Sequence, residues 1–329
     1  MTLKMKTISQ QCVKVDMPKP LDLLSKSELD RKACIGKIMT YTLKSLTEKF
    51  VDNGFQWLLP VALSQSTDPL WPDPGASIEK RIEVDIYGKT VRATASMIIH
   101  KLVAASLAYP KLFILSPNIR IEKGERAQTG KHIYEFTQLD FEARDTASKE
   151  ILSLVEDALY ALVKSLKRDM KAELTTLCRY DTLKAPKKPF RIYDRVELEA
   201  KYGADWEAGI ASEIQEPVWV TNVPREFYDF EDFKTGKWDN YDLFLPQYGE
   251  VLSGAKREWE YKKILAKIER DQIKKENYAL ILKLAKEGKL QPTAGGGIGI
   301  ERLVGWITGA KHVGEIQPFP RVPGTVNEL

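Results

Sequence analysis

The chain has 329 residues, which is enough for one large domain or two modest ones with a buried core. Its 50 Lys and Arg residues nearly balance 46 Asp and Glu residues, and a net charge of +4 is too slight to indicate a dedicated nucleic-acid binder. The three cysteines form no CxxC pair, so the composition excludes a disulfide scaffold. No segment resembles a membrane span or the apolar core of a signal peptide, which favours a cytoplasmic protein with no membrane partner.

The first half of the chain is predicted to alternate helices with strands. A lead-in covers residues 1–25, and apolar residues then recur at helical spacing from Ser25 to Asn53, with Ser27 and Asp30 predicted as the capping box of that helix. The segment FQWLLP predicts a short strand, and alternating segments around a Tyr-Gly-Lys turn predict a hairpin. Another helix, SMIIHKLVAASLAYP, leads into the strands KLFILSPNIRIE and IYEFTQLDFEA, which a polar loop joins.

The second half is predicted to contain a second long helix, ASKEILSLVEDALYALVKSLKRDMKAEL, and a mixed region over residues 180–240. The strand YDLFLP, the turn QYGEVLSGAKR and a Lys/Glu-rich helix from about residue 256 to residue 287 follow. Hairpins separated by helices, without regular βαβ alternation, favour an α+β fold with a mainly antiparallel sheet flanked by helices. We expect a single domain over residues 26–329.

The stretch AGGGIGIERL combines glycines with a following helical pattern. Backbone N–H groups at such a junction can approach a phosphate, and Arg302 lies in the first turn of the helix. An ordinary glycine turn before a buried helix is the more common explanation of an isolated stretch of this kind. The stretch also lacks the Rossmann and Walker A patterns.

Two further stretches carry charged residues at useful spacing. Arg120 and Glu122 share one strand face, as do Phe136, Gln138 and Asp140 on the next strand, and a hairpin brings the two rows together. That surface can hold a phosphate on Arg120, stack a base on Phe136 and bind an ammonium with Asp140, although an exposed sheet face with paired charges explains the row about equally well.

The third stretch is YGEVLSGAKRE. In it, Glu250 and Ser253 offer hard oxygen ligands for Mg²⁺ on a triphosphate, and Arg257 offers a fork for a carboxylate. Taken alone, a turn between a strand and a charged helix is the favoured explanation.

Taken together and in their order along the chain, the three stretches resemble the signature segments of class II aminoacyl-tRNA synthetases of the aspartyl/asparaginyl subgroup. NGFQWLLP resembles motif 1, IRIE…KHIYEFTQLD motif 2 and GIGIERL motif 3, and the resemblance covers residues 27–324. It implies a class II catalytic core, ATP and Mg²⁺, and a homodimer formed through the motif 1 region around Pro60.

The resemblance also implies roles for individual residues. Arg120 at the α-phosphate and Arg302 at the terminal phosphates are the implied catalytic residues. The implied ATP-binding residues are Arg120, Glu122, Lys131, His132, Phe136, Glu250, Gly299, Glu301 and Arg302. The implied substrate-binding residues are Asp68, Ser96, Lys101, Asp140, Ser253 and Arg257, and the implied Mg²⁺ ligands are Glu250 and Ser253.

The sequence departs from the family in three places. Lys131-His132 replaces Arg-His, and residues 95–98 read ASMI instead of Gln-Ser-Pro-Gln. About 25 residues precede the first helix, so we expect no anticodon-binding β-barrel. This pattern is similar to the archaeal asparagine synthetases related to this subgroup.

That similarity implies ATP-dependent activation of the β-carboxylate of aspartate as an adenylate and its transfer to free ammonia, without a tRNA partner. Aspartate would then lie reversed, with its α-carboxylate on Arg257, and Asp68 is a candidate base for ammonium. The alternative is a truncated synthetase that aminoacylates tRNA or another acceptor. A catalytically inactive paralogue is disfavoured because Arg120, Glu250 and Arg302 are all present.

Overall fold

The computed structural model describes residues 15–70 and 78–328, so the first 14 residues of the predicted lead-in, including Cys12, lie outside it. An eight-stranded sheet forms the centre of the molecule, and only its two outermost strand pairs are parallel. This arrangement confirms the predicted α+β fold with a mainly antiparallel sheet. In spatial order the strands are β1 (Gln56–Trp57), β6 (Lys111–Ile119), β8 (Glu135–Arg144), β15 (Thr293–Gly299), β14 (Gly249–Lys256), β13 (Asn240–Leu245), β10 (Val218–Thr221) and β9 (Arg191–Asp194).

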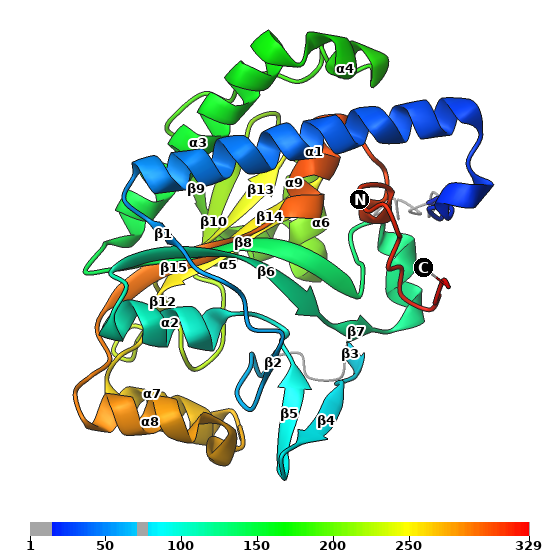
Figure 1. Ribbon diagram of the computed structural model, residues 1–329. Helices are drawn as coiled ribbons and strands as arrows, with labels where there is room; N and C mark the ends of the chain where they lie inside the picture. Colours follow the sequence, from blue (N-terminus) through cyan, green and yellow to red (C-terminus); the bar gives the residue numbers. More distant parts are fainter. Residues whose placement is uncertain (1–14, 71–77, 329) are drawn as a thin grey trace, which may run out of the picture.

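Helices cover both faces of this sheet (Figure 1). On one face lie α1 (Lys26–Asp52), α3 (Ser148–Asp169) and α9 (Ile300–Thr308). Against the other face lies α2 (Ile98–Leu107), with α7 (Tyr261–Arg270) and α8 (Ala279–Lys286) farther out. The shorter helices are α4 (Lys171–Thr176), α5 (Arg195–Tyr202) and α6 (Trp206–Glu213), with 3₁₀ segments at Leu21–Leu23, Gly124–Thr129, Gly203–Asp205, Lys275–Tyr278 and Val313–Glu315.

Smaller strand pairs extend from the main sheet. The predicted hairpin is confirmed: β4 (Glu83–Ile86) and β5 (Lys89–Ala93) pair antiparallel, and Tyr87 and Gly88 between them both have positive φ, as a tight two-residue hairpin turn requires. The other short strands are β2 (Leu63–Ser64), β3 (Ile78–Lys80), β7 (Ile121–Glu122), β11 (Glu231–Asp232) and β12 (Lys237–Trp238).

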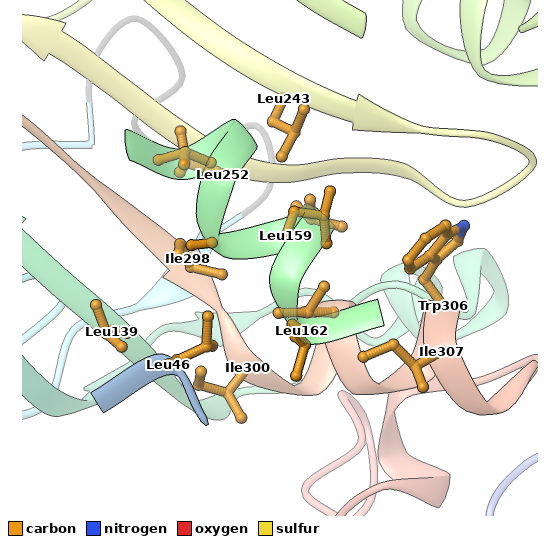
Figure 2. Close-up of a cluster of buried hydrophobic side chains, with 14 of the residues drawn as sticks. Leu46, Leu139, Leu159, Leu162, Leu243, Leu252, Ile298, Ile300, Trp306 and Ile307 are labelled. Atoms are coloured by element: carbon orange, nitrogen blue, oxygen red, sulfur yellow. The ribbon is translucent and has the colours of Figure 1, made fainter. Parts of the chain in front are cut away.

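The two faces of the sheet differ in chemistry because side chains alternate along each strand. On β8, Leu139 and Phe141 point into the main hydrophobic core with α1, α3 and α9. Figure 2 shows part of this core, where Leu46, Leu159 and Ile298 come from α1, α3 and β15. The intervening side chains of β8 face the opposite side, under α2, so the strand pattern predicted for EFTQLDFE is confirmed.

Several predicted element boundaries are wrong. The capping box of α1 is Ser25 with Glu28, not Ser27 with Asp30, because the helix begins two residues earlier than that box requires. The second long helix is interrupted at Met170 and continues as α4. The Lys/Glu-rich helix is two helices, since the chain reverses at Gln272, whose φ is positive, and brings α8 back against α7.

The glycine stretch is also different from the prediction. The glycines from Gly295 to Gly297 lie within β15, paired with β8 on one side and β14 on the other, and not in a phosphate-binding turn. A Cβ added at Gly295 would lie 2.2 Å from the Phe141 carbonyl oxygen, so the strand packs too closely for a side chain there. Likewise, the predicted turn QYGEVLSGAKR is strand β14 from Gly249 onward.

Two exclusions made from composition can be compared with the structure. Cys34 and Cys178 are free thiols, and Cys12 lies outside the described residues. Among residues 15–70 and 78–328, no helix is both long and apolar enough to cross a bilayer.

Candidate active site

Three adjoining cavities open on the polar face of the sheet. The first, which we call the Arg302 cavity, has a volume of about 130 Å³. It is lined by all nine residues predicted to bind ATP, namely Arg120, Glu122, Lys131, His132, Phe136, Glu250, Gly299, Glu301 and Arg302. The second, the Arg257 cavity, has a volume of about 180 Å³ and is lined by all six predicted substrate-binding residues, namely Asp68, Ser96, Lys101, Asp140, Ser253 and Arg257.

The Arg302 and Arg257 cavities share part of their walls. Arg120, Gln138, Glu250 and Gly297 line both of them. A third and larger cavity, of about 470 Å³, contains Arg120 and Glu250 as well and extends to Glu207 on α6. Sequence reasoning thus found residues from five separate segments that the fold brings around one connected space.

Arg120 lies where the Arg302 and Arg257 cavities meet. Its guanidinium carbon is 5.2 Å from the centre of the Phe136 ring, and its Nε donates to the Ala95 carbonyl oxygen at 3.0 Å. Its Nη2 is 3.8 Å from Oδ2 of Asp68. These contacts fix the guanidinium plane while leaving N–H donors for an anion at the junction.

Arg302 is fixed mainly by carbonyl oxygens. Its Nε donates to the Lys131 carbonyl oxygen at 3.3 Å and its Nη1 to the Glu250 carbonyl oxygen at 3.0 Å, and Oε1 of Glu250 is 3.5 Å away. Burial and the charge of Arg302 lower the pKa of Lys131. A phosphate would relieve this repulsion between two neighbouring cations.

His132 is held as a neutral imidazole. Its Nε2 accepts from Arg126 at 2.7 Å, so its Nδ1 carries the proton and donates to Thr129 Oγ1 at 2.5 Å. Burial, reinforced by Arg302 and Arg126, lowers the pKa of His132 to about 2. The neutral ring positions Arg126, a cavity residue that the sequence did not single out.

Glu301 lines the Arg302 cavity but is occupied by the protein itself. Both of its carboxylate oxygens accept from the Thr137 backbone N–H at 3.0 Å, and Gln317 Nε2 approaches one of them at 3.5 Å. Burial raises its pKa to about 7. Its contacts thus tie α9 to β8 beside the cavity.

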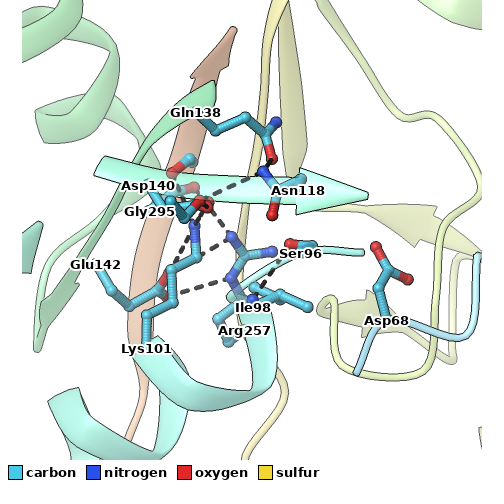
Figure 3. A network of polar contacts seen from close by, with 12 residues as sticks. Asp68, Ser96, Ile98, Lys101, Asn118, Gln138, Asp140, Glu142, Arg257 and Gly295 are labelled. Atoms are coloured by element: carbon cyan, nitrogen blue, oxygen red, sulfur yellow. Dashed lines mark hydrogen bonds and ion pairs between the residues drawn. The ribbon is translucent and has the colours of Figure 1, made fainter. Parts of the chain in front are cut away.

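The Arg257 cavity contains a buried network of charges (Figure 3). Lys101 Nζ donates to Asp140 Oδ1 at 2.9 Å and to the Gly296 carbonyl oxygen at 2.7 Å, and Ser116 Oγ donates to Asp140 Oδ2 at 2.6 Å. Both oxygens of Asp140 therefore already have a donor. An incoming ammonium would have to share this carboxylate with Lys101.

Arg257 has two carboxylate partners in the same network. Its Nε donates to Glu142 Oε1 at 3.1 Å, and its Nη1 donates to Asp229. Lys101 and Arg257 thus face three carboxylates, Asp140, Glu142 and Asp229, and this end of the cavity has a net charge of −1. It offers N–H donors and carboxylate acceptors side by side.

The loop after β10 supplies cavity residues that sequence reasoning missed. Arg225, Glu226, Tyr228 and Asp229 line the Arg257 cavity, and Arg225 is paired with Asp242. Four polar or charged residues within the six-residue segment PREFYD were the available signal, but the segment has neither helical nor strand periodicity. Sequence reasoning also missed Glu142, which comes two residues after Asp140 on β8. The alternation of side chains along the strand places both on the same face and could have identified it.

The donor set at Glu250 fits a magnesium ion bound partly by a nucleotide. Glu250 and Ser253 both lie on β14 and line the Arg257 cavity, and both present hard oxygen atoms. Within the described residues there is no group of three or more His, Cys, Asp or Glu residues that could hold a metal. Mg²⁺ at Glu250 would therefore complete its shell with phosphate and water oxygens, as Mg²⁺ commonly does.

An antiparallel sheet flanked by helices, with these cavities over its central strands, is the catalytic-core fold of class II aminoacyl-tRNA synthetases. The chain belongs to the family of class II tRNA synthetases for D, K and N, whose model matches residues 77–323. Class II synthetases are ligases that use ATP and Mg²⁺.

Individual relatives agree with this assignment. The asparagine–tRNA ligase of Thermoplasma acidophilum is 27% identical over 305 residues, which cover 87% of this chain and 68% of that protein. The crystal structure of asparaginyl-tRNA synthetase from Pyrococcus horikoshii complexed with asparaginyl-adenylate has a TM-score of 0.81 and 25% identity, and covers 94% of this chain and 75% of that one. A putative aspartyl-tRNA synthetase from Leishmania major shares the fold, with a TM-score of 0.71, 18% identity, and coverage of 90% and 66%. The family match and the Thermoplasma acidophilum relative support a synthetase-type ligase and give no support to the narrower prediction of an aspartate–ammonia ligase.

Proposed function

We propose that this chain is an ATP-dependent ligase that converts a carboxylate of asparagine or aspartate into an acyl adenylate. The observation that carries the proposal is the shared wall of the two cavities, where Arg120 lies between a space suited to ATP and a space suited to an amino acid. A carboxylate oxygen would attack the α-phosphorus there, and the bond from that phosphorus to the leaving pyrophosphate would break.

The protein's contribution to this step is orientation and charge stabilisation. Arg120 would neutralise the α-phosphate as charge develops, and Arg302 with Lys131 would hold the leaving pyrophosphate. Phe136, already stacked against Arg120, would support the adenine. Bound Mg²⁺ would supply further positive charge on the phosphates, held by Glu250 and Ser253.

The mixed charges around Arg257 restrict the group that binds there. A lone carboxylate would meet Asp140, Glu142 and Asp229, and their repulsion would oppose its attraction to Arg257. A group that both accepts and donates hydrogen bonds is better matched. Two such groups are the carboxamide of asparagine and the α-amino-carboxylate end of a reversed aspartate.

The first arrangement is the leading candidate. Asparagine would place its carboxamide at Arg257 and its α-carboxylate at Arg120, and the adenylate would pass to a ribose hydroxyl of tRNA. The relatives from Thermoplasma acidophilum and Pyrococcus horikoshii are named for asparagine and tRNA, and this similarity supports the acceptor.

The second candidate is the asparagine synthetase reaction predicted from the sequence. Aspartate would lie reversed, its β-carboxylate would be activated at Arg120, and ammonia would displace AMP to give asparagine. The observation that favours it is a pair of carboxylates, Asp68 and Glu226, that line the Arg257 cavity near Arg120 and suit an ammonium ion. A complex with the α-carboxylate of aspartate at Arg120 would refute this orientation.

The predicted homodimer fits either candidate. Trp57 and Leu59, which lie in the motif 1 segment, are 54% and 87% exposed, and Val61, directly after it, is 37% exposed. Apolar side chains exposed together in this way favour burial in an interface.

A two-stage assay with the purified chain tests the proposal. ATP–pyrophosphate exchange is first measured with Mg²⁺ and either asparagine or aspartate, and products are then measured after adding tRNA or ammonium. We expect exchange with asparagine and formation of asparaginyl-tRNA. Asparagine formed from aspartate only with ammonium would establish the second candidate, and no exchange with either amino acid would refute the proposal.

A further inference from the structure

A lysine and a glutamate are completely buried next to the Arg257 cavity and have no part in the proposed reaction. Lys267 lies on α7 and Glu258 lies between β14 and that helix, and both side chains are 0% exposed. Lys267 Nζ is 3.8 Å from Glu258 Oε2, so the two charges face each other without a direct hydrogen bond. Neither residue lines the cavity, but Lys267 contacts Asp229, which does.

Lys267 gives its hydrogen bond to the loop after β10. Its Nζ donates to the carbonyl oxygen of Asp229, and the Asp229 carboxylate in turn accepts from Arg257 Nη1. The Glu258 carboxylate holds the start of α7, because its Oε1 accepts from two backbone N–H groups there at 3.1 Å each. Its Oε2 makes no hydrogen bond in the part of the chain that the structure describes, and the charge of Lys267 compensates it.

Stability is a poor explanation for this buried pair. Taking two charges out of water has a large free-energy cost, which their mutual attraction often fails to offset, so apolar residues of similar size would often stabilise the fold as well. Burial lowers the pKa of Lys267 to about 8, against the opposing charges of Glu258 and Asp229. The contact with the loop is therefore the feature of Lys267 that an apolar side chain could not replace.

The peptide group between Asp229 and Phe230 is held from both of its sides. On one side, the Phe230 N–H donates to the Lys256 carbonyl oxygen at 2.9 Å. On the other side, the Asp229 carbonyl oxygen accepts from Lys267. Because this peptide group adjoins the Asp229 Cα, its orientation determines whether the carboxylate reaches Arg257.

We propose that Lys267 is a positioning residue that keeps the Asp229 carboxylate on Arg257 and thereby sets the affinity of the cavity for its amino acid. Glu258 supports this role by compensating the buried charge of Lys267. Arg257 is fixed by Asp229 on one side and by Glu142 Oε1, 3.1 Å from its Nε, on the other. When Asp229 is displaced, the guanidinium can rotate about the Glu142 contact and loses its alignment. This inference rests on the proposed adenylate-forming function.

Lys267→Met tests the proposal because it removes the charged donor and keeps a side chain of similar length. Loss of a hydrogen bond from a charged group predicts a rise of about 10- to 100-fold in the amino-acid KM, measured by pyrophosphate exchange. We expect kcat and the KM for ATP to stay unchanged, because the contact serves amino-acid binding alone. Lys262→Met on the exposed surface of α7 is the matched control and should change none of these values. An unchanged amino-acid KM in Lys267→Met would overturn the proposal.

A double variant separates positioning from folding. Lys267→Met leaves Glu258 as an unpaired buried charge and should lower the urea midpoint, whereas Lys267→Met/Glu258→Gln removes both charges and should recover most of it. The amino-acid KM should stay high in the double variant, because the Asp229 carbonyl oxygen still lacks its donor. A KM that recovers together with the urea midpoint would show that Lys267 is only structural. If the single variant does not fold, the double variant alone carries the KM test.

The pH dependence of the KM is a readout that a purely structural role would not change. The titratable groups whose charges act on Lys267 are Glu258, Asp229, Glu231 and Arg270. Since the pKa of Lys267 is lowered to about 8, the wild-type protein loses this charge as the pH rises from about 7 to about 9. The ratio of the KM of Lys267→Met to the wild-type KM should therefore fall over this range, and titration of the substrate cancels in the ratio. A constant ratio would contradict the proposal.

A crystal structure of the double variant gives a measurement that does not depend on activity. We expect the Asp229 carboxylate to lie beyond hydrogen-bond distance from Arg257 Nη1 in that structure. An unchanged contact would overturn the inference even if the KM rises. A displaced Asp229 in the variant, together with wild-type protein that performs no exchange with either amino acid, would instead refute the proposed function and leave the positioning role of Lys267 supported.

Discussion

Asp229→Asn tests whether the net charge around Arg257 selects the amino acid. In the wild-type chain, two cations face three carboxylates, so neutralising Asp229 changes the net charge of this end of the cavity from −1 to 0. The asparagine amide oxygen can still accept from Arg257, and Glu142 remains as the second partner of that guanidinium. The substitution therefore removes charge with little loss of packing.

The size of the effect follows from Coulomb's law. One unit charge about 7 Å from a bound carboxylate, at an effective dielectric constant of about 20, contributes about 2 kcal/mol. We expect the ratio of kcat/KM for aspartate to kcat/KM for asparagine to rise about 10- to 30-fold in Asp229→Asn. The reason is that a side-chain carboxylate at Arg257 meets one fewer negative charge.

Pyrophosphate exchange with each amino acid measures this ratio directly. Glu48→Gln removes the same charge from the exposed surface of α1, where Glu48 lies 3.8 Å from Lys44, and is expected to leave the ratio unchanged. Urea unfolding checks that Asp229→Asn remains folded. A fall in the ratio would show that aspartate uses Asp229 for its α-ammonium and would refute the asparagine orientation, and an unchanged ratio would refute the charge argument itself.

Three further substitutions test the nucleotide site and the sheet. Arg302→Ala should lower the pyrophosphate exchange rate about 10²- to 10³-fold, while Arg302→Lys should retain part of the rate. If the alanine variant unfolds at a much lower urea concentration than the wild-type protein, Arg302 has a structural role instead. Gly295→Ala should destabilise the sheet by about 1–3 kcal/mol because the new Cβ meets backbone atoms. Gly297→Ala should fold but raise the amino-acid KM, because its Cβ would lie 2.9 Å from Asp140 Oδ1. Similar urea midpoints for the two variants would contradict this difference. Burial raises the pKa of Glu301 from 4.5 to about 7, so the folded protein binds this proton more tightly than the unfolded chain does. The free energy of unfolding should therefore fall by about 3 kcal/mol as the pH rises from 4.5 to 7. Glu301→Gln should flatten that decline in urea titrations at several pH values.

The sequence was informative wherever a local period coincides with the tertiary environment. The alternation in EFTQLDFE predicted which β8 side chains share a face, and the structure places Leu139 and Phe141 in the core and Asp140 in the cavity. The helical spacing of apolar residues in α1 was equally clear. Its first residue was misplaced because Ser25 and Ser27 both satisfy the preference for a cap, and the reciprocal contact with Glu28 decides between them.

Two features were not predicted. Residues 269–277 carry one apolar residue, Ile273, five positions from both Ile268 and Tyr278, so the helical period breaks where the chain reverses at Gln272, and the prediction of one helix passed over that break. The reversal lets α7 and α8 share one buried cluster, which includes Ile264 and Ile281. The loop after β10 has no period at all. Glu226 and Tyr228 become cavity residues only because that loop crosses the polar face of the sheet at the height of Asp68.

The glycine stretch acquires a different physical role from the one its sequence suggested. On the polar face, each alternate glycine of β15 lies opposite a polar residue of β8: Gly295 opposite Glu142, Gly297 opposite Asp140, and Gly299 opposite Gln138. A Cβ at Gly297 would lie 2.9 Å from Asp140 Oδ1 and 3.0 Å from Gln138 Nε2. These glycines therefore create space for a row of polar side chains beside the cavities, and the proposed contacts with phosphate are made by side chains, among them Arg302 in the first turn of the helix that follows.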